Sequence, residues 1–165
     1  MNFAARTARV LSLHIHPAVG GDAMISVPEL DLIAGQGILQ DKRYFGRKSR
    51  NGEPTKRQLT LIEREQIAEH AAALGLQSIR EGLVRSNIET ENIGLVPLAG
   101  RPLRIGTAVI LIGKPRDPCE KMDRIAPGLK DLMDHGKQGV LAQVIESGKV
   151  RLLDEITVLA KSPAF

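Results

Sequence analysis

The residue with the clearest chemical potential is Cys119, the only cysteine among the 165 residues of the chain. It lies in the stretch GKPRDPCEKMD, residues 113–123, where an apolar run gives way to prolines and charges. A free thiol can be inert packing, a ligand for a soft metal or a sulfur nucleophile. A single cysteine excludes an internal disulfide and any zinc site built from several cysteines.

The residues around Cys119 have the pattern of a helix start. Asp117 suits the N-cap, Pro118 suits the first helical position, and Glu120 stands at the capping-box position. Cys119 would then be the second helical residue, near free backbone N–H groups, with Arg116 just outside the helix. Both features favour the thiolate, which is the nucleophilic and metal-binding form. A buried, inert cysteine is the alternative, and the chain position leaves both interpretations open.

Histidines are the other residues that could act with this thiol. A cysteine hydrolase needs a histidine as base, but no histidine lies near Cys119 in the sequence. His14 and His16 are two residues apart and share a face of an expected strand. Because a third ligand is lacking nearby in the sequence, we do not expect a metal site at this pair.

Composition describes the domain that must position these groups. Hydrophobic residues make up 42% of the chain, charged residues 25% and aromatic residues 2%, so we expect a soluble globular domain with an aliphatic core. The shortage of aromatic side chains counts against base stacking on single-stranded nucleic acid. The N-terminus lacks the pattern of a signal peptide, and no apolar run is long enough to cross a bilayer. We therefore expect a cytoplasmic protein with no membrane partner.

Apolar patterning predicts a mainly β chain with a few short helices. Numerous short strands usually close into a barrel or pack as a sandwich. Residues 41–57 form a loop by composition, with seven Lys or Arg against Asp41 and Glu53. The other expected elements are strands at 7–15, 23–38, 101–106 and 107–113, a helix from Thr60 as N-cap to Gly75 as its stop, a short helix at 128–136, and a hairpin within 139–160 that turns at Ser147 and Gly148.

Five motifs in order resemble the MOSC domain family, which occurs at the C-terminal end of molybdenum cofactor sulfurases and as small stand-alone bacterial proteins. The most specific of them is PRDPC, Pro115 to Cys119, at the end of an expected strand. Gln40 and Leu153 depart from the family pattern, because glycine is expected at both positions. The motifs are GILQDKRY at 37–44, RQLTLIERE at 57–65, RSNI at 85–88, LAGRPLRIGTAVILIGKPRDPC at 98–119 and GVLAQVIESGKV at 139–150.

The resemblance implies a fold and a role for the thiol. The implied fold is one domain over residues 1–165, with motifs spanning about 9–160, in which short helices decorate a closed β-barrel like the middle domain of pyruvate kinases. The implied role of Cys119 is to carry sulfur as a persulfide or to ligate molybdenum when the pterin cofactor is bound. The sulfurases make their sulfur in a separate PLP-dependent domain. Because the MOSC-like region fills this chain, we expect no PLP site here and a partner cysteine desulfurase as sulfur donor.

The resemblance also implies an anion site, because molybdopterin carries a phosphate. Arg116, which flanks the thiol, is the main candidate to act with Cys119. Asp41 is expected to hold an arginine in place rather than to act as an acid. A solvated surface is the simpler interpretation of Arg47, Lys48 and Arg50. The residues expected to bind the cofactor are Arg57, Arg85, Asn87, Lys42, Arg43 and Asp41, with Asn87 offering its amide to the pterin or capping a turn.

Three functional hypotheses follow. In the first, Cys119 accepts sulfane sulfur and delivers it to a metal-cofactor enzyme, which would make any catalysis sulfurtransferase-like. In the second, Cys119 ligates molybdenum in an oxidoreductase component, as in related reductases of N-hydroxylated compounds, which usually have a further N-terminal segment. The third is a nucleic-acid binder that uses the basic loop at 42–57. The lack of aromatic residues and the modest net charge of +4 make it the weakest of the three.

Overall fold

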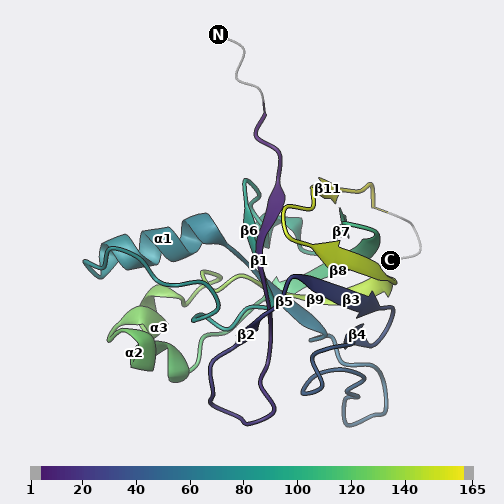
Figure 1. The fold of residues 1–165 in the computed structure, drawn as a ribbon, viewed down its shortest axis with the longest axis horizontal. Coiled ribbons are helices and arrows are strands. Elements are labelled where there is room, and N and C mark those ends of the chain that lie inside the picture. The colour runs from purple at the N-terminus through teal and green to yellow at the C-terminus, as the bar shows by residue number, and fades with distance from the viewer. Residues whose placement is uncertain (1–4, 162–165) are drawn as a thin grey trace.

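A computed structural model of the chain describes residues 5–161 (Figure 1). It is mainly β, as the sequence predicts. The strands are β1 (Arg9–Ile15), β2 (Ile25–Ser26), β3 (Glu29–Ile33), β4 (Gly37–Ile38), β5 (Leu59–Glu63), β6 (Ile88–Glu91), β7 (Pro102–Ile105), β8 (Ala108–Pro115), β9 (Val140–Glu146), β10 (Gly148–Arg151) and β11 (Ile156–Val158). The helices are α1 (Arg64–Ala73), the 3₁₀ turn η1 (Val96–Leu98), α2 (Lys121–Ile125) and α3 (Leu129–Leu132).

The main sheet is an open half-barrel, so the expectation of a closed barrel was wrong. Its strand order is β11-β7-β8-β9-β5-β6-β1-β2. Within residues 5–161 the two ends approach only through one isolated bridge, Arg9 to Glu155, and a few backbone hydrogen bonds such as that from Val10 N to Asp154 O at 3.0 Å. The end strands β2 and β11 have two and three residues, which is too short to complete a ladder.

Strands β5 and β6 are parallel neighbours, and α1 is the crossover between them. This arrangement corrects the predicted helix start. Thr60 is buried inside β5, and α1 begins at Arg64 with Glu63 as its N-cap residue. The TLIE pattern fits a capping box, but pairing of Leu59–Leu61 with β9 holds these residues in a strand. Gly75 follows the helix end with φ of +71°, as its expected role as a stop requires.

The predicted hairpin over 139–160 was also wrong. Strands β9 and β10 follow each other along the chain but lie in different sheets, because β10 pairs with β3 in a three-stranded sheet of order β10-β3-β4. Gly148 makes the bend possible, since an added Cβ there would lie 2.4 Å from the Thr107 carbonyl carbon. Ser147 reinforces the bend by accepting the Ala34 N–H at 2.8 Å.

Two apolar clusters hold the fold together. The larger cluster lies inside the half-barrel and contains aliphatic side chains from β1, β3, β5, β7, β8 and β9. The second cluster joins α1 to α2 and α3 on one side of the sheet, through residues such as Ile67, Met122 and Leu129 (Figure 1). No helix among the described residues is long and apolar enough to cross a membrane. The segment that carries Cys119 connects the two clusters, because it runs from β8 to α2.

Candidate functional site

Cys119 lies in the short connection between β8 and α2, and its side chain is exposed. The predicted helix start at Asp117 was wrong. The helix begins at Lys121, and the Cys119 carbonyl accepts the Met122 N–H at 3.0 Å, so the thiol precedes the helix. Asp117 is exposed and lies 3.8 Å from Lys114 rather than capping the helix. Exposure also excludes the interpretation of Cys119 as buried core packing.

Arg116 is buried beside this exposed thiol. Its backbone N–H donates to Gly139 O at 2.9 Å, and its Nη1 donates to Ser86 Oγ at 3.1 Å and to Val84 O at 3.4 Å. Burial, together with the charge of Arg57, lowers the pKa of Arg116 to about 10, while the negative charges that Cys119 and Tyr44 can carry oppose the shift. The guanidinium therefore stays positive at neutral pH without a carboxylate to compensate it.

Asp41 is the centre of a buried hydrogen-bond network. Its Oδ2 accepts His16 Nδ1 at 2.7 Å, the His16 backbone N–H at 3.1 Å and Asn87 Nδ2 at 3.1 Å. Burial alone would raise the pKa of Asp41, but the hydrogen bonds and charge of His16 outweigh it and hold the pKa below 3.8. Asp41 thus holds a histidine and an amide, not an arginine as expected from the sequence.

Asn87 connects this network to the main sheet. Its Oδ1 accepts the Thr60 N–H at 3.0 Å, and its Nδ2 also donates to His14 O at 3.0 Å. These contacts occupy the amide with partners in the protein and make Asn87 a positioning residue for Asp41. Its direct binding to a pterin remains a prediction.

Tyr44 is the ring around which the arginines gather. The guanidinium carbons of Arg57, Arg47 and Arg43 lie 4.9, 5.0 and 5.9 Å from the ring centroid. The His16 ring packs at 4.6 Å with an interplanar angle of 56°. Because Tyr44 contacts both His16 and these cations, it links the Asp41 network to the positive cluster.

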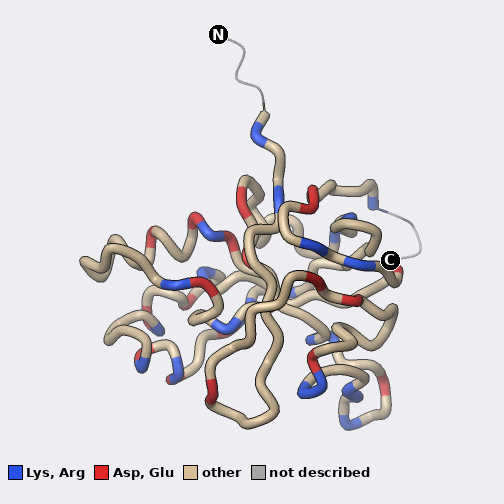
Figure 2. Tube along the Cα trace, in the orientation of Figure 1, with Lys and Arg blue, Asp and Glu red and all other residues tan. Residues whose placement is uncertain are grey.

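Four of the predicted arginines form what we call the arginine cluster: Arg43, Arg57, Arg85 and Arg116. Within residues 5–161 none of them lies within 4.0 Å of a carboxylate oxygen, although the chain forms several such pairs elsewhere. Arg85 donates to the Asp22 carbonyl at 2.8 Å from a backbone with φ of +63°. Lys42 is exposed and has no hydrogen bond or ion pair in the described part of the chain. Lys48 and Arg50 are exposed in the loop, as expected of solvated residues. Figure 2 shows that Lys and Arg positions are spread along the whole trace and are interspersed with Asp and Glu.

Two buried polar atoms at this site have no hydrogen-bond partner in the described structure: Asp41 Oδ1 and Arg43 Nη1. Buried groups of this kind are rare, because each one forfeits its hydration. One is an acceptor and the other a donor, so a ligand with both kinds of group would satisfy them. The described residues supply no hydrogen bond to either atom.

Sequence reasoning missed two residues of the site, His16 and Tyr44. The sequence offers His16 as half of a metal pair with His14 or as one of the histidines that could approach Cys119, whereas the structure gives His14 and His16 separate partners. His14 is bonded to Ser12 Oγ at 2.9 Å and burial lowers its pKa. Tyr44 is the only tyrosine of the chain and stands in the GILQDKRY motif, which was the signal available. Among the described residues no group of three or more His, Cys, Asp or Glu is placed to hold a metal ion.

Comparison with known proteins places this geometry in a family. The family model described as MOSC domain matches residues 34–157. The protein YuaD from Bacillus subtilis has a similar structure, with a TM-score of 0.76, 22% identity, and coverage of 92% of this chain and 94% of that one. YiiM from Escherichia coli has a TM-score of 0.66, 23% identity and coverage of 93% and 71%.

YiiM from Geobacillus stearothermophilus has a TM-score of 0.71 at 15% identity, with coverage of 93% and 75%. The search of curated proteins found no match. At these identities the solved structures establish the fold alone. The family model matches more than half of the 165 residues and includes both Asp41 and Cys119. The chain therefore belongs to the MOSC domain family, which is associated with binding of the molybdenum cofactor.

Proposed function

We propose that this protein binds a molybdenum-pterin cofactor at the arginine cluster, with the Cys119 thiolate as the protein's ligand to the metal. The observation that carries the proposal is the unpaired charge of the cluster beside an exposed thiol. Arg116 is only 7% exposed and lacks a carboxylate partner in the described structure. A buried charge is costly unless it is compensated, so this site favours an anion.

The donor set fits such a cofactor. Its phosphate is a dianion of the kind that arginine guanidinium groups bind in a bidentate manner. Its pterin ring has both N–H donors and acceptors, which match the unpartnered Asp41 Oδ1 and Arg43 Nη1. A thiolate is a soft ligand suited to a metal with sulfur ligands, and Cys119 is the only thiol available. Because no three-residue metal cluster is found among the described residues, the metal would arrive with its organic ligand.

Each group then has a defined task. Arg57, Arg85 and Arg116 hold the anionic ligand, while His16 and Asn87 orient Asp41. Arg116 lies three residues before Cys119, so one segment carries both a cation for the ligand and the sulfur. When bound, the cofactor supplies redox chemistry at its metal, and the protein's residues bind it, orient it and present the sulfur.

Exposure of Cys119 favours a second candidate function, that of a sulfur carrier. A carrier must expose its thiol to a partner, and a partner cysteine desulfurase holds sulfane sulfur as a persulfide. The Cys119 thiolate would attack the terminal sulfur of that persulfide. A new S–S bond forms on Cys119, the donor's S–S bond breaks, and the donor leaves as a thiolate. No net oxidation occurs, and the acceptor would be a metal-cofactor enzyme.

One pair of measurements separates the two functions. The wild type, Cys119→Ser and Arg116→Ala are purified from a host that makes the cofactor, and molybdenum is measured by mass spectrometry and pterin by fluorescence after oxidation. We expect both in the wild type, less of both in Cys119→Ser, because the cofactor loses its bond to the protein, and neither in Arg116→Ala. The charge-matched control Arg50→Ala should behave like the wild type, because Arg50 is exposed in the 41–57 loop.

The second measurement is intact mass after incubation with a cysteine desulfurase and cysteine. A gain of one sulfur atom that is lost on reduction and absent in Cys119→Ser supports the carrier. Sulfur gain in a wild-type protein that takes up no molybdenum or pterin overturns cofactor binding in favour of the carrier. If neither sulfur nor cofactor is bound, both functions are overturned.

A further inference from the structure

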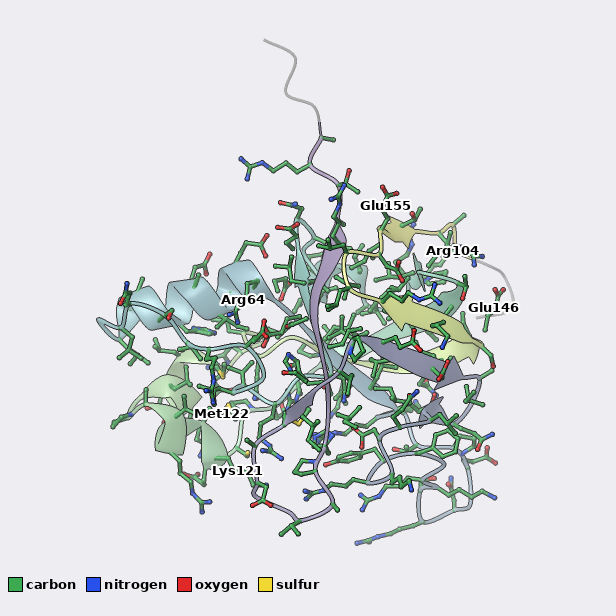
Figure 3. The ribbon with its side chains drawn as sticks, viewed as in Figure 1. Arg64, Arg104, Lys121, Met122, Glu146 and Glu155 are labelled. Carbon is green, nitrogen blue, oxygen red and sulfur yellow. The ribbon has the colours of Figure 1, made fainter. Side chains whose placement is uncertain are left out.

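A second basic pocket of about 430 Å³ lies next to the arginine cluster. Its walls are the loop between β1 and β2, the segment at 80–85, and α2, and only Arg85 belongs to both sites. Figure 1 places α2 and α3 away from the loop that follows β4, and Figure 3 labels Lys121 and Met122 on this α2 side. The volume is in the range of small-molecule pockets.

The pocket combines positive charge with apolar surface. Arg80, Arg85, Lys121 and Arg124 line it, against a single acidic residue, Glu81. In the described part of the chain none of the four cations lies within 4.0 Å of a carboxylate oxygen, so their charge is not cancelled by a direct partner. Its apolar lining comes from Met24, Leu83 and Ile125, and is sufficient to cover a flat organic group.

A buried carboxylate outside the pocket lining holds one lining residue, Gly82, in place. Glu89 is fully buried and accepts the Gly82 N–H at 2.8 Å through Oε1, while its Oε2 accepts Arg64 Nη1 at 2.8 Å. Gly82 packs so tightly that an added Cβ would lie 2.9 Å from His14 Nδ1. These contacts fix the 80–85 segment before any ligand arrives, and such pre-organisation lowers the cost of binding.

The opposite wall is fixed by Arg85. Its Nη1 donates to the Asp22 carbonyl at 2.8 Å, so the β1–β2 loop is held against the 80–85 segment. Arg85 belongs to the arginine cluster as well as to the pocket, so the two sites share one wall. Lys121 lines the pocket only two residues after Cys119.

We propose that this pocket binds a small organic anion with an apolar body, such as an aryl phosphate, as the substrate of the centre at Cys119. The anionic group would lie among Arg80, Lys121 and Arg124, and the apolar body against Met24 and Leu83. The substrate assignment rests on the proposed function, whereas anion binding by the pocket does not. The pocket uses residues other than those assigned to the cofactor, apart from Arg85.

Binding can be measured with 1-naphthyl phosphate by fluorescence titration, because the chain has no tryptophan to interfere. We expect saturable binding in the wild type and at least tenfold weaker binding of uncharged 1-naphthol. The double variant Lys121→Glu/Arg124→Glu should bind naphthyl phosphate at least tenfold more weakly. Its matched control is Lys48→Glu/Arg50→Glu, which makes the same change in net charge on the exposed loop and should bind like the wild type.

Two results would overturn anion binding by the pocket: unchanged affinity in the Lys121→Glu/Arg124→Glu variant, or equal weakening in the loop control. A second readout tests the link to Cys119. Naphthyl phosphate should slow alkylation of Cys119 by neutral iodoacetamide several-fold in the wild type but not in Lys121→Glu/Arg124→Glu. An unchanged alkylation rate in the wild type overturns the substrate assignment.

The two proposals fail in different ways. If the protein binds naphthyl phosphate but takes up no molybdenum, anion binding by the pocket is supported. The cofactor site and the substrate assignment are then both overturned. Molybdenum uptake by a protein that does not bind naphthyl phosphate overturns the pocket alone. The Cys119→Ser variant should bind naphthyl phosphate as the wild type does, since Cys119 does not line the pocket.

Discussion

Replacing Arg116 by methionine should make the ligand-free protein more stable. Burial and neighbouring positive charge lower the pKa of Arg116 from 12.5 to about 10. Each unit of pKa corresponds to about 1.4 kcal/mol, so keeping this guanidinium charged destabilises the folded state by about 3 kcal/mol. Methionine has a similar length, carries no charge and adapts to irregular sites.

Part of that gain is lost with the hydrogen bonds. Arg116 donates to Ser86 Oγ at 3.1 Å and, at the longer distance of 3.4 Å, to Val84 O. Removing these bonds costs about 1–2 kcal/mol. The net expectation for Arg116→Met is a free energy of unfolding about 1–2 kcal/mol higher than that of the wild type. For a domain of this size that corresponds to a Tm about 2–8 °C higher.

The assay is urea denaturation followed by circular dichroism at neutral pH, in a buffer without phosphate. The sign of the pH dependence follows from the lowered pKa of a base. The cost is fully present below the folded pKa and is relieved as Arg116 loses its proton, so the difference from Arg116→Met should narrow as the pH rises through about 10. Added phosphate should stabilise the wild type more than Arg116→Met, because the variant lacks one of the charges that bind it.

The control is Arg116→Lys, which keeps the charge but loses the planar fork. It should be no more stable than the wild type. The reasoning is refuted if Arg116→Met is less stable than the wild type by more than about 1 kcal/mol, because the hydrogen bonds of Arg116 would then outweigh the cost of its buried charge. Arg116 would in that case be a structural residue rather than one held ready for an anion.

Four further outcomes are expected. Asp41→Asn should lower the free energy of unfolding by about 1–3 kcal/mol in urea titrations. The wild type should lose stability as the pH falls from 3.8 through the lowered pKa of Asp41, because the carboxylate is then protonated in the folded protein. Asp41→Asn should lack this part of the pH dependence. Burial lowers the pKa of His14 below 6.5, so the free energy of unfolding of the wild type should fall as the pH drops from 6.5 toward that lower pKa. In His14→Gln, measured in the same way, the free energy of unfolding should depend less on pH over this range. Gly139→Ala places a Cβ 1.9 Å from Leu61 O and should lower the Tm by an amount equivalent to about 3 kcal/mol or more. Leu153→Gly should raise the free energy of unfolding by about 0.5–1 kcal/mol, because φ is +66° there and the side chain is exposed; an unchanged or lower value would contradict the argument from backbone strain.

The elements that sequence reasoning predicted well are those with a local physical cause. The α1 stop at Gly75 and the short helix α3 follow from residues that determine their own conformation. The failures depend on distant partners. Thr60 has a good capping pattern, but its neighbours pair with β6 and β9, and tertiary pairing outweighs a cap of about 1 kcal/mol.

The same distinction applies to the site. The sequence places Arg116 near Cys119, because they are three residues apart. Arg57 and Arg85 lie in motifs that resemble the family, and the resemblance is what marks them as candidate cofactor-binding residues. It does not predict that Asp41 holds His16, since their 2.7 Å contact joins residues 25 positions apart. At position 40 this chain has Gln40 where the family pattern has glycine, and a hydrogen-bond pair explains the difference. The Gln40 side chain accepts the Asp31 N–H at 3.0 Å and donates to Asp31 Oδ2 at 2.6 Å, which glycine cannot do.

The position of Cys119 outside α2 changes which part of the structure lies next to its thiol. Cys119 precedes the five-residue helix α2 and is not the second helical residue that the sequence predicts. The charge that remains close is that of Arg116, which is buried and held by Ser86. Under the proposed function the exposed sulfur is the metal ligand and the buried cation is part of the anion site. Substitution of Arg116 should therefore change both anion binding and the reactivity of Cys119, whereas substitutions at the start of α2 should change neither by this route.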